Sequence, residues 1–155
     1  GSPELQFVSG ATCAEPVCLE DIMPTLLEVA GIDVPDHVQG KSLVGVLRSG
    51  QGHIRDYLLG EHSPCYSAKQ AYHFLTDGRA KYVWRPHDGA EQLFDLRRDP
   101  TELRDLAGRR ERARDLKAWR TRMVKQLAGR PEGFSDGRKL VAGRTYEAAL
   151  PHARP

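Results

Sequence analysis

The sequence predicts an α+β fold: a small antiparallel sheet of three to four strands packed by a long C-terminal helix, plus a helix near the N-terminus. Three observations support this prediction. Two Asp-Gly pairs separate segments rich in β-branched and aromatic residues, a stripe of large apolar residues recurs at helical spacing over 111–128, and a second helical pattern covers 19–30. The 155 residues are enough for a hydrophobic core, and a composition that is 39% hydrophobic and 28% charged is typical of globular domains.

The first helix is expected over 19–30 (LEDIMPTLLEVA), starting near 20–22. Pro24 fits only the first turn of this helix, where its missing N–H costs nothing, and Gly31 suits the left-handed residue after the last turn. The apolar side of the helix is formed by Ile22, Leu26, Val29 and Ala30. Residues 43–47 are expected to add one or two further helical turns.

Strands are expected over 71–76, 80–85 and 92–96, with 56–62 as a candidate fourth strand. Asp-Gly pairs favour tight hairpin turns, and they occupy 77–78 and 88–89 between these segments. The pattern therefore predicts an antiparallel meander.

The last strand is expected to stop at Asp99-Pro100, after which Leu103 and Leu106 anchor the chain to the sheet. A long helix follows over 111–128 and ends at Gly129. Its apolar stripe is formed by Leu116, Trp119, Met123 and Leu127. Trp119, like Trp84 on the third strand, is expected to pack in the core, and a tail held by Phe134, Leu140 and Tyr146 completes the chain.

The charge is unevenly distributed although the net charge is only +2. Residues 109–130 carry nine basic and two acidic side chains. Such a run suggests nucleic-acid binding, but a solvated arginine-rich helix face is commoner and no nucleic-acid-reading motif accompanies it. Nucleic acid is therefore not expected as a partner, and neither is a membrane, because no apolar segment has spanning length.

The three cysteines, Cys13, Cys18 and Cys65, are an odd number without CxxC spacing, which favours a reducing, cytoplasmic compartment over a disulfide framework. The six histidines are scattered without metal-ligand spacing, so no metal site is expected from this chain. His73 within a strand is expected to be packed or on the surface, and His87 in a turn is expected to be solvated.

Several segments, in this order, resemble the C-terminal part of sulfatases of the alkaline phosphatase superfamily. They are LEDIMPTLLEVAGIDVPDHVQGKSL, GEH, LTDGRAKYVW and EQLFDLRRDPTELRDLAG. The tail GRPEGFSDGRKL is similar to tails of the arylsulfatase and phosphonate-monoester-hydrolase branch. The resemblance implies a small antiparallel sheet packed by a helix, preceded by a larger α/β catalytic domain.

The resemblance also implies which cofactors the whole enzyme uses. The parent family uses a divalent metal and a formylglycine made from Cys or Ser in C/S-x-P-x-R, both upstream of the first helix. No cysteine or serine here is followed by Pro and Arg at those positions, and Cys65 has Ser67 where the motif has Pro. No catalytic residue, metal ligand or cofactor is therefore assigned to this chain.

By the same resemblance, Glu61, His62 and Tyr66 lie at the rim of the substrate pocket, where His62 or Tyr66 contacts substrate or gates the cleft. The alternative is that Glu61 and His62 hydrogen-bond the sheet to the neighbouring domain. The expected organisation is a leader or vector remnant over 1–12, a helical segment joining from the catalytic domain over 13–50, the sulfatase-like α+β subdomain over 51–128 and an extended tail over 129–155.

Two functional hypotheses follow. The chain is the C-terminal part of a hydrolase of sulfate, phosphonate or phosphate monoesters and is inactive alone, with the missing N-terminal catalytic domain as its partner. Alternatively, it is a free-standing structural or interaction module, paired with a second copy of itself through the surface that the catalytic domain would cover. An arginine-rich helix that binds nucleic acid is the third hypothesis, and it requires a steep loss of binding with salt.

Overall fold

The structure is a computed structural model that describes residues 6–64 and 67–144. The chain divides into two compact units, of which the first ends at Leu58 and the second begins at Leu59. Among the described residues, no helix is both long and apolar enough to cross a membrane.

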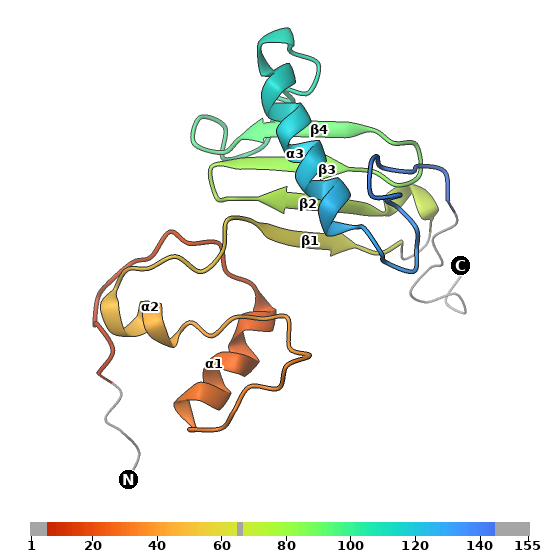
Figure 1. The fold of residues 1–155 in the computed structure, drawn as a ribbon. Helices are drawn as coiled ribbons and strands as arrows, with labels where there is room; N and C mark the ends of the chain where they lie inside the picture. Colours follow the sequence, from red (N-terminus) through yellow and green to blue (C-terminus); the bar gives the residue numbers. More distant parts are fainter. Residues whose placement is uncertain (1–5, 65–66, 145–155) are drawn as a thin grey trace. The chain divides into compact units, whose positions relative to one another are not determined.

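The first unit contains two helices, α1 (Ile22–Val29), preceded by a 3-10 turn at Leu19–Asp21, and α2 (Val44–Ser49) (Figure 1). Both helices predicted from the sequence are confirmed, and Pro24 is buried in the first turn of α1. A threonine connects the two helices. The Thr25 hydroxyl donates a hydrogen bond to the Asp21 carbonyl and accepts one from the Leu43 N–H, just before α2, at 2.9 Å.

The second unit is built on a four-stranded antiparallel sheet in the order β1-β2-β3-β4 (Figure 1). Its strands are β1 (Leu58–His62), β2 (Tyr72–Thr76), β3 (Ala80–Trp84) and β4 (Glu91–Asp95). All four predicted strands are confirmed, and the candidate fourth strand is β1 at one edge. The Asp77-Gly78 turn forms as expected, since Gly78 has a φ of 79° and the Asp77 carboxylate accepts hydrogen bonds from the Arg79 and Ala80 N–H groups.

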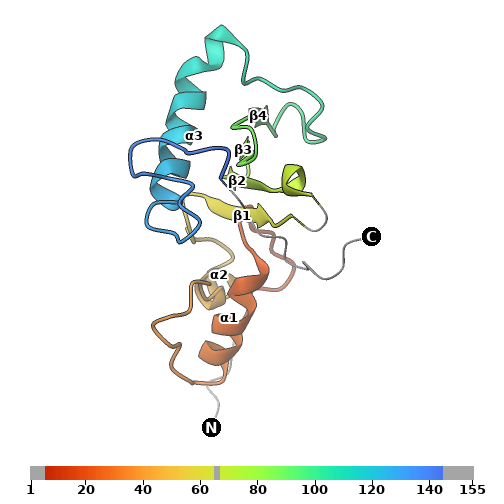
Figure 2. The same cartoon turned by 90° about the vertical axis from the view of Figure 1, so that its right-hand side faces the viewer.

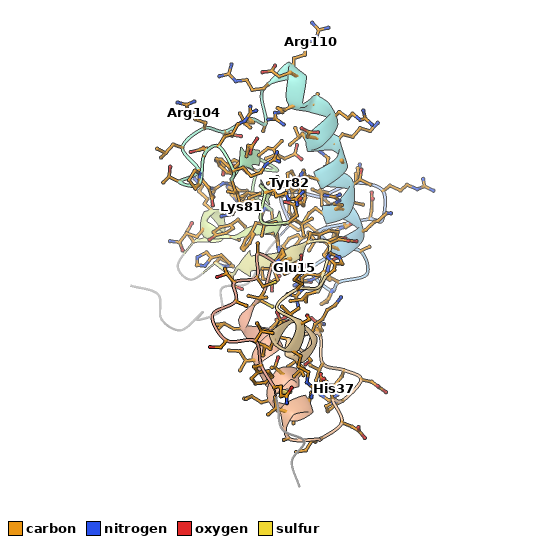
Figure 3. All side chains as sticks on the ribbon, turned by 90° about the vertical axis from the view of Figure 1, so that its left-hand side faces the viewer. Glu15, His37, Lys81, Tyr82, Arg104 and Arg110 are labelled. Carbon is orange, nitrogen blue, oxygen red and sulfur yellow. The ribbon has the colours of Figure 1, made fainter. Side chains whose placement is uncertain are left out.

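The helix α3 (Ala113–Gln126), which follows a 3-10 turn at Arg110–Arg112, covers one face of the sheet (Figure 2). Side chains alternate along β3, so Tyr82 points toward α3 while its neighbour Lys81 points to the opposite side (Figure 3). The buried core of this unit is formed by Leu75, Tyr82, Trp84, Leu93, Trp119, Met123, Val124, Leu127 and Phe134. The predicted core roles of both tryptophans are confirmed. Val124 extends the predicted stripe of the helix.

The connection from β4 to α3 differs from the prediction at one residue. Leu103 is 82% exposed and does not anchor the chain, whereas the Leu106 N–H donates to the Leu93 carbonyl at 2.8 Å and its side chain is half-buried. Leu103 is exposed because of a tight turn in the backbone, which the spacing of apolar residues in the sequence does not predict. Glu102 has a left-handed φ of 57°, and the Asp99 carboxylate accepts a hydrogen bond from the Arg104 N–H at 2.8 Å, which turns Leu103 outward.

The segment after α3 folds back onto the sheet. Phe134 is buried, and the Ser135 hydroxyl donates to the Val124 carbonyl at 2.7 Å. Further along, the Gly143 N–H donates to the Pro86 carbonyl at 2.8 Å, beside the turn between β3 and β4. Leu140 is half-buried, while Tyr146 lies outside the described residues.

Candidate functional site

The chemistry-bearing side chains gather at one end of the sheet. The β1–β2 connection and the β3–β4 turn lie at this end, because the start of β2 pairs with the end of β3, as in His73 opposite Trp84. The sequence-predicted residues Glu61 and His62 terminate β1 at the same end. Tyr66, the third predicted rim residue, lies outside the described residues.

Glu61 is held in a cluster of charged side chains. Its Oε2 lies 2.8 Å from Nη1 of Arg130 and 3.3 Å from Nδ1 of His73, and Nη2 of Arg130 donates to Oε1 of Glu132 at 2.7 Å. The hydrogen bonds that Arg130 donates to the Glu132 and Glu61 carboxylates raise the pKa of Arg130 above its usual range, and Arg130 in turn lowers the pKa of Glu132. Glu61 therefore joins the edge strand to the segment that follows α3.

His73 is fully buried behind this cluster. Its ring lies 5.9 Å from the ring of Trp84 and 5.5 Å from that of Phe134. Burial lowers the pKa of His73, and the nearby Glu61 carboxylate only partly opposes this shift. The packed position expected for this histidine is confirmed.

His62 is exposed and its ring stacks on Tyr72 at a centroid distance of 5.3 Å. Of the two predicted rim residues that the structure describes, His62 therefore presents a ring to solvent, whereas Glu61 is engaged in ion pairs within its own unit. His87 is also exposed, as expected.

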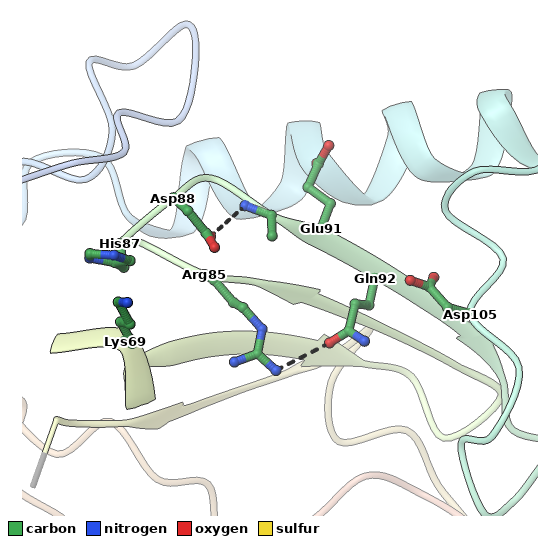
Figure 4. Close-up of a pocket in the computed structure, with 8 residues that line it drawn as sticks. Lys69, Arg85, His87, Asp88, Glu91, Gln92 and Asp105 are labelled. Atoms are coloured by element: carbon green, nitrogen blue, oxygen red, sulfur yellow. Dashed lines mark hydrogen bonds between the residues drawn. The ribbon is translucent and has the colours of Figure 1, made fainter. Parts of the chain in front are cut away.

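A groove of about 600 Å³ lies at this end of the sheet, which we call the outer groove (Figure 4). It is lined by Lys69, Arg85, His87, Asp88, Ala90, Glu91, Gln92 and Asp105. A second hollow shares Arg85 and Gln92 with the outer groove and continues toward Tyr72 and Glu102. Sequence reasoning missed Lys69 and Arg85, because only the pairing of the strands brings them together.

Several basic residues of the arginine-rich segment have structural partners. The Arg120 guanidinium donates to the Glu91 carboxylate, with 2.7 Å from Nε to Oε1, and the Tyr82 hydroxyl donates to the same carboxylate. Arg112 pairs with Asp95 and Asp115. The Arg122 guanidinium lies 4.5 Å from the centroid of the Trp119 ring. These partners favour the solvated structural helix over a nucleic-acid surface.

Within the ranges that the structure describes, no group of three or more His, Cys, Asp or Glu side chains could hold a metal ion. Cys13 and Cys18 are free thiols, and burial raises the pKa of Cys18. A raised pKa disfavours the thiolate that a nucleophile requires. Cys65 lies outside the described residues.

The four-stranded antiparallel sheet and the helix α3 that covers one of its faces define an α+β domain. Residues 5–129 match the family described as N-sulphoglucosamine sulphohydrolase, C-terminal, and the chain belongs to this family.

Relatives with known activities agree with this assignment. The chain is 39% identical over 150 residues to an arylsulfatase of Clostridium perfringens. This alignment covers 97% of this chain and 30% of that protein. It is 37% identical over 101 residues to arylsulfatase K of Mus musculus, covering 59% of this chain and 18% of that protein. The crystal structure of the phosphonate monoester hydrolase of Agrobacterium radiobacter aligns with a TM-score of 0.57 and 29% identity, over 70% of this chain and 24% of that one. The chain thus spans less than a third of the length of these relatives.

Proposed function

We propose that this chain is the C-terminal part of a hydrolase of sulfate, phosphonate or phosphate monoesters, and that it works with an N-terminal catalytic domain. The observation that carries the proposal is the alignment with the Clostridium perfringens arylsulfatase, which takes in almost all of this chain but only 30% of that enzyme. We also propose that the chain is inactive alone. No Cys or Ser in the whole sequence stands in a C/S-x-P-x-R motif, and the metal and formylglycine of the intact enzyme are assigned to the upstream domain.

An exposed apolar surface supports the proposed partner. Ile22, Met23 and Leu26 of α1 are 51%, 47% and 62% exposed. Leu19 and Val17, which precede the helix, are 84% and 52% exposed. Clustered apolar exposure of this kind is typical of surfaces that another domain or chain covers. We assign this α1 surface to the catalytic domain.

A chimera tests the proposal. The matching C-terminal 30% of the Clostridium perfringens arylsulfatase is replaced by this chain, and hydrolysis of 4-nitrophenyl sulfate, a phenylphosphonate ester and 4-nitrophenyl phosphate is compared with that of the enzyme truncated at the same point. The chimera is expected to be soluble and active, and the truncated enzyme and the isolated chain inactive. A chimera no more soluble or active than the truncated enzyme contradicts the proposal.

A matched pair of variants checks the α1 surface. Leu26→Glu places a charge on the surface and is expected to lower the solubility and activity of the chimera. Leu103→Glu makes the same change at another exposed leucine, one that belongs to the second unit, and is expected to have little effect. Equal effects of the two substitutions would remove α1 from the interface.

The rim role of His62 and Tyr66 is part of this proposal. The exposed ring of His62 on Tyr72 supports contact with substrate, whereas Glu61 is held within its own unit by its ion pair with Arg130 and its contact with His73. In the chimera, His62→Ala is expected to raise KM with the fold unchanged. An unchanged KM would show that His62 is an exposed residue that does not contact substrate.

The same α1 surface also favours the second candidate, a free-standing module that pairs with a copy of itself. Sedimentation equilibrium of the 155-residue chain distinguishes the two. A dimer that Leu26→Glu dissociates would support the free-standing module. A monomer would support an α1 surface that is covered by the catalytic domain in the intact enzyme.

We propose a cytoplasmic location because the cysteine count is odd and because Cys13 and Cys18 are free thiols. Cell fractionation can test this location.

A further inference from the structure

We propose that the outer groove binds an oxyanion group, whether carboxylate, sulfate or phosphate, between Lys69, Arg85 and His87. This site goes beyond the proposed function, because it belongs to the sheet of this chain and needs no residue of a catalytic domain.

The pairing of its basic side chains distinguishes this groove. Elsewhere in this unit, several half-buried basic side chains have carboxylate partners, as in Lys81 with Glu102 and Arg120 with Glu91. Lys69 and Arg85 have no carboxylate within ion-pair distance among residues 6–64 and 67–144. Within the part of the chain that the structure describes, the side-chain partner of Arg85 is the Gln92 amide oxygen, 3.5 Å from Nη2. A guanidinium carries five N–H donors, so most of the donors of Arg85 remain available to a ligand.

Two of the three acidic side chains that line the groove, Glu91 and Asp105, lie away from Lys69 and His87. Glu91 points toward α3, where the Arg120 guanidinium neutralises it (Figure 4). The Asp105 carboxylate lies at the far end of the groove and accepts hydrogen bonds from the Leu93 and Ala107 N–H groups at 3.0 and 2.9 Å.

Asp88 is the one acidic side chain at the cationic end. Its Oδ1 accepts the Ala90 N–H at 2.9 Å, which holds it within the β3–β4 turn. With Lys69 and Arg85 against this single carboxylate, the end of the groove keeps a positive charge.

The basic side chains of the groove come from three places in the chain. Lys69 belongs to the 3-10 turn at Ala68–Gln70, Arg85 follows β3 and His87 belongs to the β3–β4 turn, and all three line the same groove (Figure 4). A planar guanidinium and an ammonium that line one groove can together bind the two or more oxygens of an oxyanion. The volume of about 600 Å³ falls in the range of small-molecule sites, so the oxyanion can be part of a larger ligand.

The test is isothermal titration calorimetry of the 155-residue chain with sodium sulfate, sodium phosphate and sodium acetate, each against sodium chloride at matched ionic strength. We expect saturable heat that chloride does not reproduce. The ranking of the three salts then states which oxyanion the site prefers. Arg85→Gln is expected to weaken binding by about tenfold, since it removes charge-assisted hydrogen bonds.

Matched variants keep the result interpretable. Lys117→Gln removes a charge from an exposed position of α3 and is expected to leave the affinity unchanged. Lys69→Gln, at an exposed side chain, carries the test if Arg85→Gln fails to fold. Absence of saturable binding beyond the chloride background overturns the proposal, and so does an equal loss in Lys117→Gln and in the groove variants. Neither result bears on the chimera, so the two proposals fail separately.

Discussion

Arg55 forms a bidentate salt bridge with Asp21, 34 positions earlier in the sequence, and Nη1 of Arg55 lies 2.8 Å from Oδ2 of Asp21. The Asp21 carboxylate also accepts hydrogen bonds from the Cys18 N–H at 2.9 Å and the Lys41 N–H at 2.8 Å. It is fully buried, so this one side chain joins three segments of the first unit. Burial raises the pKa of Asp21, but the hydrogen bonds from Arg55, Lys41 and Cys18 outweigh it and hold the pKa well below its usual range.

Asp21→Asn is expected to destabilise the first unit by about 3 kcal/mol, because it leaves the Arg55 side chain, which is only 10% exposed, without its counter-charge. Both tryptophans lie in the second unit, so peptide-level hydrogen exchange is the suitable measurement. Faster exchange is expected over 18–50 and no change over 72–95. Asp33→Asn, at an exposed carboxylate, is the control. Equal exchange in the two variants would show that the salt bridge does not hold the unit.

The same carboxylate gives the first unit a pH dependence. The pKa of Asp21 is lower in the folded state than in the unfolded state. Its contribution to the free energy of unfolding is therefore complete above the unfolded pKa of about 3.9, and it is lost as the pH falls through the folded pKa. Exchange over 18–50 is therefore expected to accelerate in strong acid in the parent chain. In Asp21→Asn, the part of this acid-induced acceleration that comes from protonation of Asp21 should be absent.

Gly40 is a second requirement of the first unit. A Cβ atom at this position would lie 1.9 Å from the carbonyl oxygen of Glu20, and a backbone atom cannot move aside as a flexible side chain can. Gly40→Ala is expected to cost several kcal/mol, of the order of the largest single-substitution effects. Gly45→Ala, in α2 with open space around it, should be neutral or slightly stabilising. Similar exchange rates over 18–50 in the two variants would contradict the close approach.

His73 gives the second unit a different pH dependence. Burial lowers its folded pKa below the unfolded value of about 6.5, so the unfolded state binds more protons near and below that pH. The free energy of unfolding is therefore expected to fall as the pH drops from about 7 toward 5. Urea unfolding followed by tryptophan fluorescence measures it. His73→Phe should flatten this range, and a slope that is the same in the parent and the variant would rule out His73 as its source.

Arg120 tests whether the arginine-rich helix is structural. It pairs with Glu91, which also receives the Tyr82 hydroxyl, but its side chain is 43% exposed and solvent screens the pair. Arg120→Gln is expected to cost about 1 kcal/mol in urea unfolding. Arg114→Gln, at an exposed position with no ion-pair partner among the described residues, should cost less than about 0.5 kcal/mol. Matching losses would mean that the two arginines are equivalent.

The sheet and the long helix could be predicted because their signals are local. Two Asp-Gly turns, alternation along the strands and the spacing of Trp119, Met123 and Leu127 each lie within a few residues. The outward turn of Leu103 could not be predicted, since it depends on the left-handed φ of Glu102.

Long-range contacts determine the parts of the candidate site that the sequence did not reveal. Glu61 and His62 were found through the family resemblance of the GEH segment. The hydrogen bond from Arg130 to Glu61, 69 positions away, depends on how the chain folds back after α3. The register of the sheet places Lys69 and Arg85 along the same groove. Asp21 and Arg55 are likewise separated by 34 positions, with no pattern that pairs them.

If this chain is part of a larger hydrolase, as we propose, its natural polypeptide is much longer than the chain. The most direct measurement is the size of the natural polypeptide in its own cell, detected with an antibody raised against the α3 segment Ala113–Gln126. We expect a product roughly three times as long as these 155 residues, since the chain corresponds to 30% of the Clostridium perfringens arylsulfatase. A product no longer than these 155 residues would contradict the claim and favour the free-standing module.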